Sequence, residues 1–148
     1  MTSESSGTAV PTGFRPHGRR SGFLDTVGPL YVDDADPRAP VFGLRLDDRH
    51  MNGRGRVHGG VLTTLADSAL GYGALAAHGE DRAILTASLT VDYTGSAVAG
   101  EWIEARTTLK RMGSRLAFAG CEITCDHRPL ASCSGVFSVP PRGGPRSR

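Results

Sequence analysis

Residues 58–77 read His58-Gly59-Gly60-Val-Leu-Thr-Thr-Leu-Ala-Asp67-Ser-Ala-Leu-Gly-Tyr-Gly-Ala-Leu-Ala-Ala77. Small and apolar residues dominate this stretch, and Asp67 is its one carboxylate. The composition predicts a buried helix that begins at about Gly59 and continues for about 19 residues, or about 28 Å. Because so apolar a helix belongs in a core, we expect the rest of the fold to be built around it.

Asp67 is the first candidate for chemistry in this chain. Burying an unpaired carboxylate costs several kcal/mol, so a buried acid is normally paired, hydrogen-bonded or shifted in pKa. Those are also the conditions under which a carboxylate becomes a useful base or nucleophile. The alternative is a structural acid whose oxygens are satisfied by donors of the helix or sheet.

Composition limits the classes of protein to which the chain can belong. At 148 residues without an internal repeat, it is expected to form one domain, and its net charge of +2 is too small to indicate a nucleic-acid partner. No run reaches the roughly 18 apolar residues of a membrane span. Cys121, Cys125 and Cys133 lack metal-ligand or CxxC spacing, which favours reduced core thiols over a zinc or redox site and suits a cytoplasmic protein.

The two ends of the chain differ in composition from its middle. Residues 1–20 and 140–148 mix Ser, Thr, Gly, Pro and Arg without periodicity, and we expect both to be disordered tails. The folded domain is therefore predicted to span residues 21–139.

Strand patterns flank the predicted helix. Pro29–Val32 and Pro40–Leu46 are expected to form a hairpin, followed by a polar loop over Asp47–Val57. After the helix, Leu85, Ala87, Leu89, Val91 and Tyr93 alternate with polar residues, which is typical of a strand with one buried face. Three further strands, over 102–110, 115–126 and 130–139, complete an expected four-stranded meander. One helix on an antiparallel sheet is an α+β fold.

The segment Asn52-Gly-Arg-Gly-Arg-Val-His58-Gly59-Gly60, with Asp67 nine residues after the histidine and an antiparallel meander downstream, resembles the hotdog-fold thioesterases. It is most similar to the PaaI-like acyl-CoA thioesterase branch, and the resemblance covers residues 42–139. It implies a long central helix wrapped by an antiparallel sheet. It also implies a homodimer, or a tetramer of two dimers, in which sheets join edge to edge and active sites lie between subunits.

The same resemblance assigns roles to five residues. Asp67 corresponds to the catalytic carboxylate, acting either as general base on water or as nucleophile. Gly59 corresponds to the backbone amide that polarises the thioester oxygen, and a helix N-terminus suits that task. Asn52 corresponds to a polar residue that orients water or the thioester, His58 to a neighbour that shapes the loop, and Thr86 to a hydroxyl beside the carboxylate.

Structural alternatives exist for three of these residues. Asn52 followed by glycine is also a common turn pair. His58 can be purely structural, because no second ligand lies at metal spacing and neither a metal nor another cofactor is required. Thr86 can simply belong to the polar face of a strand.

Candidate substrate contacts lie in three places. Gly60 adjoins the proposed amide. Coenzyme A carries three phosphates, so cations are expected near the mouth of the pocket: Arg111 and Arg115 share a hairpin turn with Lys110, and Arg54 and Arg56 flank the Asn52 loop. The acyl group is expected in an apolar slot lined by Leu62, Leu70 and Tyr72.

Helix geometry adds an argument for a dimer. Gly59 and Asp67 are eight residues apart, about 12 Å along a helix, which is too far for both to act on one carbonyl. Two antiparallel helices related by a twofold axis would bring Gly59 of one chain to Asp67 of the other. We therefore expect an acyl-CoA thioesterase that releases free CoA and a carboxylic acid. The alternatives are a hotdog hydratase or dehydratase and a non-catalytic acyl-CoA-binding protein.

Overall fold

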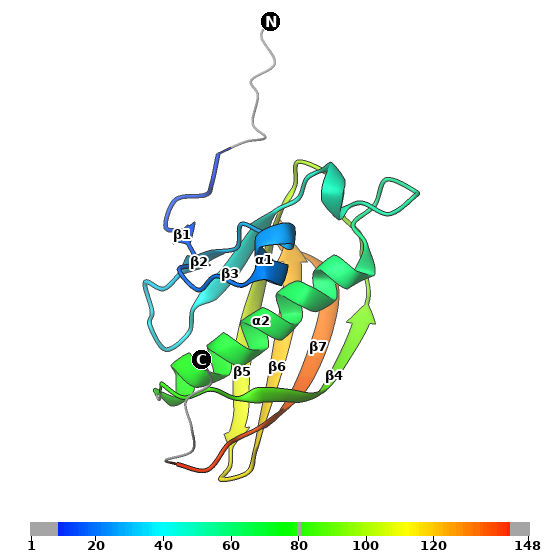
Figure 1. The fold of residues 1–148 in the computed structure, drawn as a ribbon. Coiled ribbons are helices and arrows are strands. Elements are labelled where there is room, and N and C mark those ends of the chain that lie inside the picture. The colour runs from blue at the N-terminus through cyan, green and yellow to red at the C-terminus, as the bar shows by residue number, and fades with distance from the viewer. Residues whose placement is uncertain (1–8, 80, 143–148) are drawn as a thin grey trace, which may run out of the picture.

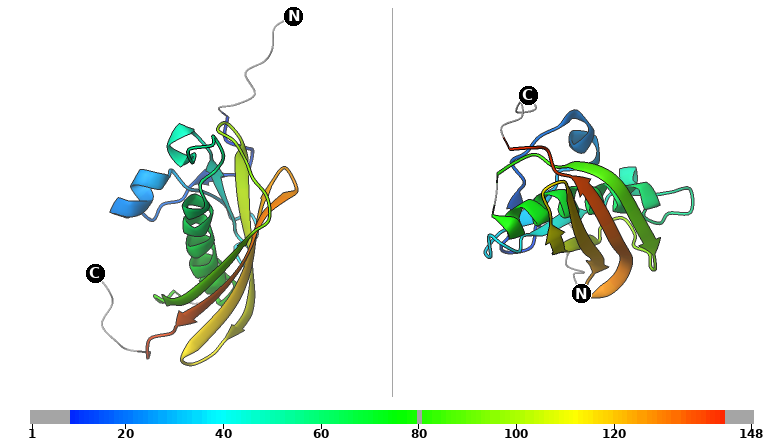
Figure 2. Two further views of the ribbon diagram at one scale, coloured as in Figure 1. Left: turned by 90° about the vertical axis from the view of Figure 1, so that its right-hand side faces the viewer. Right: turned by 90° about the horizontal axis from the view of Figure 1, so that it is seen from below.

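One long helix lies against the concave face of a curved antiparallel sheet (Figures 1 and 2). The structure is a computed structural model that describes residues 9–79 and 81–142. The helix, α2, spans Gly59–His78, one residue longer than predicted, and ends at Gly79 in the left-handed conformation. The side view in Figure 2 shows the sheet bending around it.

The sheet has the strand order β1-β2-β3-β5-β6-β7-β4, and all neighbouring strands are antiparallel. The strands are β1 (Arg15–Pro16), β2 (Tyr31–Asp33), β3 (Val41–Arg45), β4 (Leu85–Tyr93), β5 (Trp102–Met112), β6 (Leu116–Cys125) and β7 (Arg128–Ser138). A short helix, α1 (Gly22–Val27), and a 3-10 turn, Asp48–His50, precede α2. The predicted hairpin of β2 and β3 and the α+β hotdog class are both confirmed.

The face of α2 that meets the sheet follows helical spacing. Its fully or nearly fully buried residues are Leu62, Leu65, Ala66, Ala69, Leu70, Gly73 and Ala74. Small residues let the helix approach the sheet closely: a Cβ atom at Gly73 would lie 2.6 Å from Cβ of Thr107 on β5. The Thr107 hydroxyl donates a hydrogen bond to the Ala69 carbonyl at 2.9 Å and ties the two layers together.

The predicted four-stranded meander was wrong in its order. β5, β6 and β7 follow one another, but β4 pairs with β7 and forms an edge of the sheet. The alternating apolar face predicted to be buried in β4 is therefore largely uncovered, with Leu85 62% and Tyr93 54% exposed. An edge strand has a neighbour on one side only, and α2 covers the centre of the sheet more than this edge.

The folded region begins earlier than the predicted boundary at residue 21. Arg15–Pro16 pair with β2, Phe14 packs edge-on against Trp102, and His17 packs against Phe42 and Tyr72. These aromatic contacts outweigh the loop-like composition of the segment. The remaining parts of the predicted tails, residues 1–8 and 143–148, lie outside the described residues.

All three cysteines are buried and free, as the sequence predicted. Cys121 and Cys133 face each other on β6 and β7. The hydrogen bond to Cys133, together with burial, raises the pKa of the Cys121 thiol. Within the described residues, no helix is long and apolar enough to cross a membrane.

Candidate active site

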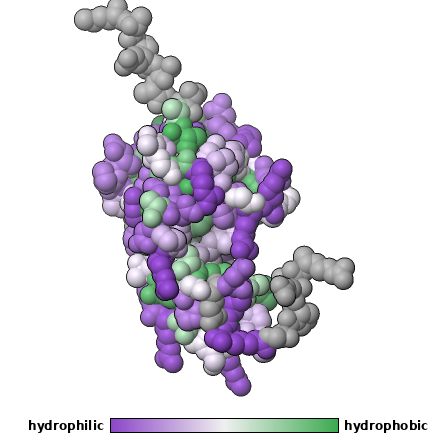
Figure 3. Space-filling model, turned by 90° about the vertical axis from the view of Figure 1, so that its left-hand side faces the viewer, coloured by the Kyte–Doolittle hydropathy of each residue, from purple (hydrophilic) through white to green (hydrophobic). Residues whose placement is uncertain are grey.

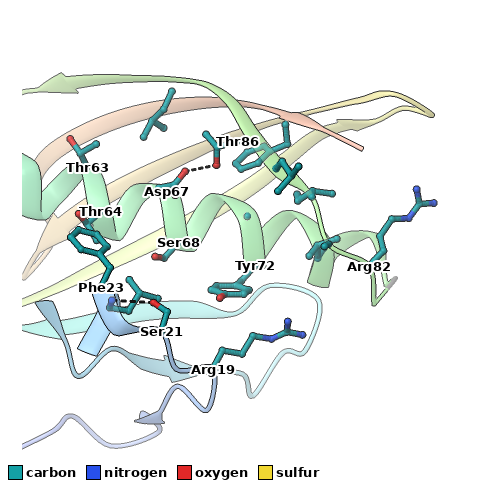
Figure 4. A pocket seen from close by; sticks show the side chains of 18 residues that line it. Arg19, Ser21, Phe23, Thr63, Thr64, Asp67, Ser68, Tyr72, Arg82 and Thr86 are labelled. Carbon is teal, nitrogen blue, oxygen red and sulfur yellow. Dashed lines mark hydrogen bonds between the residues drawn. The ribbon is translucent and has the colours of Figure 1, made fainter. Parts of the chain in front are cut away.

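Asp67 lies at the wall of a cavity of about 620 Å³ between α2, β4 and the N-terminal segment (Figure 4). Its Oδ1 accepts a hydrogen bond of 2.7 Å from the Thr86 hydroxyl on β4. Hydroxyl groups of Thr63, Thr64 and Ser68 line the same cavity. Its apolar lining includes Phe23, Leu75, Leu89 and Phe137.

The cavity also explains why Asp67 differs from its predicted environment. The sequence indicated a buried carboxylate, but Asp67 is only partly buried, because it belongs to the side of α2 that faces the cavity and not the sheet. Its position therefore does not carry the full desolvation cost of a core acid. The structure brings Thr86 to it, as the family resemblance implied, and a neutral hydroxyl donor holds the carboxylate.

The N-terminus of α2 presents an unpaired backbone amide. His58 is the N-cap residue, and its Nδ1 accepts a hydrogen bond of 2.9 Å from the Gly60 N–H. The Gly59 N–H donates to no acceptor within residues 9–79 and 81–142. Of the two glycine amides, Gly59 is thus the one free to receive an oxyanion, at the positive end of the helix dipole. The Gly60 amide, predicted as a substrate contact, is already engaged.

Tyr93 of β4 closes one side of this helix end. A Cβ atom at Gly59 would lie 3.2 Å from the Tyr93 ring, and the Tyr93 hydroxyl is hydrogen-bonded to the Thr63 hydroxyl. Any side chain at position 59 would crowd the Tyr93 ring. Glycine avoids this crowding and leaves its backbone N–H accessible.

Asn52 has a structural task in this chain. Its side-chain oxygen accepts hydrogen bonds from the backbone N–H groups of Arg54 at 2.8 Å and Arg56 at 3.2 Å. Its own N–H donates to the Arg56 carbonyl at 2.7 Å. This is the turn interpretation of the Asn-Gly pair, and Asn52 does not line the cavity around Asp67 of its own chain.

Of the three residues predicted to line the acyl slot, one lines this cavity. Tyr72 lines the cavity, whereas Leu62 and Leu70 are buried in the helix-sheet core, with exposures of 2% and 0%. Leu62 and Leu70 belong to the stripe that faces the sheet, and Tyr72 to the neighbouring stripe. A purely apolar composition did not distinguish these two faces.

The cations at the cavity are not the predicted ones. Arg19 and Arg82 line it at the end away from Thr63 and Thr64 (Figure 4), whereas Arg111 and Arg115 lie beside the β5–β6 turn outside it. The Arg19 guanidinium carbon Cζ lies 5.5 Å from the centre of the Tyr72 ring, and its Nη2 lies 3.4 Å from Oδ1 of Asp81. No sequence signal pointed to Arg19, which falls in the segment predicted to be disordered.

Arg19 also affects a neighbouring histidine. His17 packs against Tyr72, and burial together with the positive charges of Arg19 and Arg15 lowers the pKa of His17. Both effects favour the neutral form of this imidazole. Across the described ranges, no group of three or more His, Cys, Asp or Glu side chains is arranged to hold a metal ion.

A curved antiparallel sheet around a long helix, with a carboxylate facing a cavity and a free amide at the helix N-terminus, defines this chain as a hotdog-fold protein. The sequence model of the Thioesterase superfamily matches residues 54–132. That match covers more than half of the chain. It extends from the loop before α2 into β7 and includes the residues around Asp67.

Individual relatives agree with this match. A Pseudomonas aeruginosa protein named "Putative esterase PA0474" is 40% identical over 131 residues, which cover 88% of this chain and 98% of the relative. Mouse acyl-coenzyme A thioesterase 13 is 26% identical over 70% of this chain and 73% of its own length. The solved structure of the N33D mutant of the phenylacetic acid degradation protein PaaI from Thermus thermophilus superposes with a TM-score of 0.70. It is 26% identical, over 80% of this chain and 98% of that chain.

The chain therefore belongs to the thioesterase superfamily, within its PaaI-like hotdog branch. At the general level that membership supports, it is a thioester hydrolase.

Proposed function

We propose that this protein hydrolyses the thioester bond of an acyl-CoA to give free CoA and a carboxylic acid. The observation that carries the proposal is the Asp67 carboxylate, held by the Thr86 hydroxyl at the wall of a cavity large enough for an acyl group. The name of the mouse relative, an acyl-coenzyme A thioesterase, supports CoA as the thiol.

Asp67 is suited to either of two hydrolytic routes. As general base, it takes a proton from water while the water oxygen attacks the thioester carbon and the C–S bond breaks, and the CoA thiolate receives a proton. As nucleophile, it forms an acyl anhydride and expels the thiolate, and water then cleaves the anhydride. In both routes negative charge develops on the thioester oxygen, where a helix N-terminal amide is most effective.

The amide that meets this oxygen comes, in our proposal, from a second copy of the chain. Gly59 and Asp67 of one helix are separated by about 12 Å of axial rise. A homodimer with antiparallel α2 helices gives two equivalent sites, each with Asp67 from one protomer and Gly59 from its partner. Asn52 and His58, which lie before the same helix end, would then border the partner's cavity.

The exposed edge of the sheet supports this dimer. β4 has an unpaired edge and uncovered apolar side chains, including Leu85 and Tyr93. The side of the molecule that carries β1 and β2 is mostly hydrophilic (Figure 3). Pairing through β4 would bury apolar surface and satisfy the free backbone groups of that strand.

We also propose that Arg111 and Arg115, which lie beside the β5–β6 turn outside the cavity of their own chain, contact the phosphates of CoA across the subunit interface, because guanidinium groups bind phosphates well. Truncating both to alanine is expected to raise KM several-fold with kcat unchanged, since phosphate contacts far from the thioester contribute to uniform binding.

The free, buried thiols fit our further proposal that the protein works in the reducing cytoplasm.

The experiment is thiol release from a panel of straight-chain, branched and aromatic acyl-CoAs, with Asp67→Asn as the matched variant. We expect turnover by the wild type and a loss of at least about 100-fold in Asp67→Asn, with the fold retained. Near-normal turnover by Asp67→Asn contradicts the proposal. Tight acyl-CoA binding without thiol release by the wild type would favour a binding protein, and addition of water to an enoyl-CoA a hydratase.

A further inference from the structure

Helix α2 contains two interior glycines, Gly71 and Gly73, whose surroundings differ. Gly73 is buried, and a Cβ atom there would lie 2.6 Å from Cβ and 2.9 Å from the hydroxyl oxygen of Thr107. Both distances are too short for a real side chain. Packing of the helix against the sheet therefore requires glycine at position 73.

Gly71 has no such requirement. A Cβ atom at Gly71 would meet only Cε1 of Phe137 within 4 Å, at 3.7 Å, which is ordinary van der Waals contact. Its backbone is that of a regular α-helix. Glycine is the least favourable helix-interior residue apart from proline, so neither packing within the chain nor backbone conformation accounts for it here.

The place of Gly71 at the cavity offers an explanation. It lies four residues after Asp67, one turn along the same side of α2, and it lines the cavity. Leu75, one turn further on, and Phe137 of β7 line the cavity as well. The cavity is therefore apolar next to the carboxylate, and at Gly71 no side chain narrows it.

We propose that Gly71 is a specificity-determining residue, which makes room for acyl groups that branch or carry a ring close to the thioester carbon. The inference rests on the proposed thioesterase function, because Asp67 locates the thioester. On this proposal, a branch or ring of the acyl group occupies the space that a side chain at position 71 would fill. Straight short-chain acyl groups do not reach this space, so their hydrolysis does not depend on Gly71.

The test compares wild type, Gly71→Ala and Gly71→Val on two pairs of substrates: acetyl- and butyryl-CoA, and isobutyryl- and phenylacetyl-CoA. We expect kcat/KM for the bulky pair to fall progressively, by about 10- to 200-fold in Gly71→Val, while the straight-chain pair changes less than about twofold. An equal loss on all four substrates, or no loss on any, overturns the proposal.

Thermal unfolding supplies a second readout. Gly71→Ala is expected to raise the melting temperature by about 2 to 4 °C, whereas the control Gly73→Ala lowers it. A decrease in Gly71→Ala like that of Gly73→Ala would show that packing requires both glycines, and would overturn the inference.

Failure of the proposed function has a separate signature, namely no thiol release by the wild type. In that case, calorimetric binding of the non-hydrolysable thioether analogues of acetyl-CoA and phenylacetyl-CoA tests Gly71 directly. Gly71→Val is expected to weaken only the second analogue, and unchanged relative affinities contradict the proposal.

Discussion

The Asp67 carboxylate is fixed in orientation and still has a lone pair available for chemistry. One oxygen is fixed by the Thr86 hydroxyl, and among the described residues no other hydrogen bond to the carboxylate is present. A carboxylate held at one oxygen keeps a lone pair available for a water proton or for the thioester carbon. The orientation of the acid is thus set by a residue on a different element, β4.

Thr86 is therefore expected to be a positioning residue. Thr86→Ala removes a hydrogen bond to a charged group and should lower kcat by about 10- to 100-fold with little change in KM. Thr86→Ser keeps the hydroxyl and should recover most of the lost rate. If Thr86→Ser is as slow as Thr86→Ala, or if only KM changes, the hydroxyl does not act through Asp67.

The role of the Gly59 backbone N–H can be tested with proline, which lacks this group. Proline lacks the N–H group and is accommodated at the first position of a helix, and His58 already has the extended backbone that precedes proline. Gly59→Pro should reduce kcat by about 10²- to 10³-fold, the effect of losing one oxyanion donor. Gly59→Ala retains the N–H and adds the same Cβ atom beside the Tyr93 ring as proline does, so it is the matched control for crowding at this helix end. Equal activity of the two variants would remove Gly59 from the proposed site.

At the scale of elements, the stability of α2 depends on how the helix ends as well as on its buried face. Gly79 ends the helix at φ +78°, and its N–H donates to the Leu75 and Ala76 carbonyls. Gly79→Ala places a side chain in the left-handed region and should destabilise the fold by about 1 to 2 kcal/mol. The melting temperature should fall by several degrees. Gly18→Ala, at a glycine with open space and no positive φ, should leave it nearly unchanged.

The elements that the sequence predicted well are those whose signal is local. The length of α2 and the positions of β5 and β6 follow from residues close together in the chain. The position of β4 does not, because pairing with β7 joins segments about 45 residues apart, and a local pattern cannot choose a partner strand. The apolar alternation of β4 was consequently interpreted as burial within one chain.

The same distinction between local and non-local sequence signals applies to the candidate site. The spacing of His58, Gly59 and Asp67 identified a helix end and a carboxylate, and the structure places both as expected on α2. The turn role of Asn52 and the core position of Leu70 required the backbone, because an amide in a loop and a leucine in an apolar helix each have several environments.

At the scale of the whole molecule, the N-terminal segment is part of the fold and of the cavity. Phe14 and His17 contact aromatic side chains of the sheet and α2. Arg19, Phe23 and Leu24 line the cavity. Sequence composition alone could not reveal this, since single aromatic anchors without periodicity look the same as a loop.

The largest question at this scale is how the carboxylate and the amide meet. In one chain they are separated along α2, and the uncovered β4 edge offers the surface for a second copy. A dimer, or a tetramer of two such dimers, is expected in solution, with a mass by light scattering of about two or four times the 15.6 kDa of one chain. A monomer that hydrolyses acyl-CoA at the full rate would contradict a shared site.

Subunit complementation tests the shared site most directly. Asp67→Asn and Gly59→Pro chains with different affinity tags are co-expressed, and the mixed dimer is purified on both tags. One of its two sites then carries both substitutions and the other carries neither. We predict that each homodimer is nearly inactive and that the mixed dimer has about half the wild-type rate of thiol release per dimer. A mixed dimer no more active than the two homodimers would show that Asp67 and Gly59 do not act together across the interface.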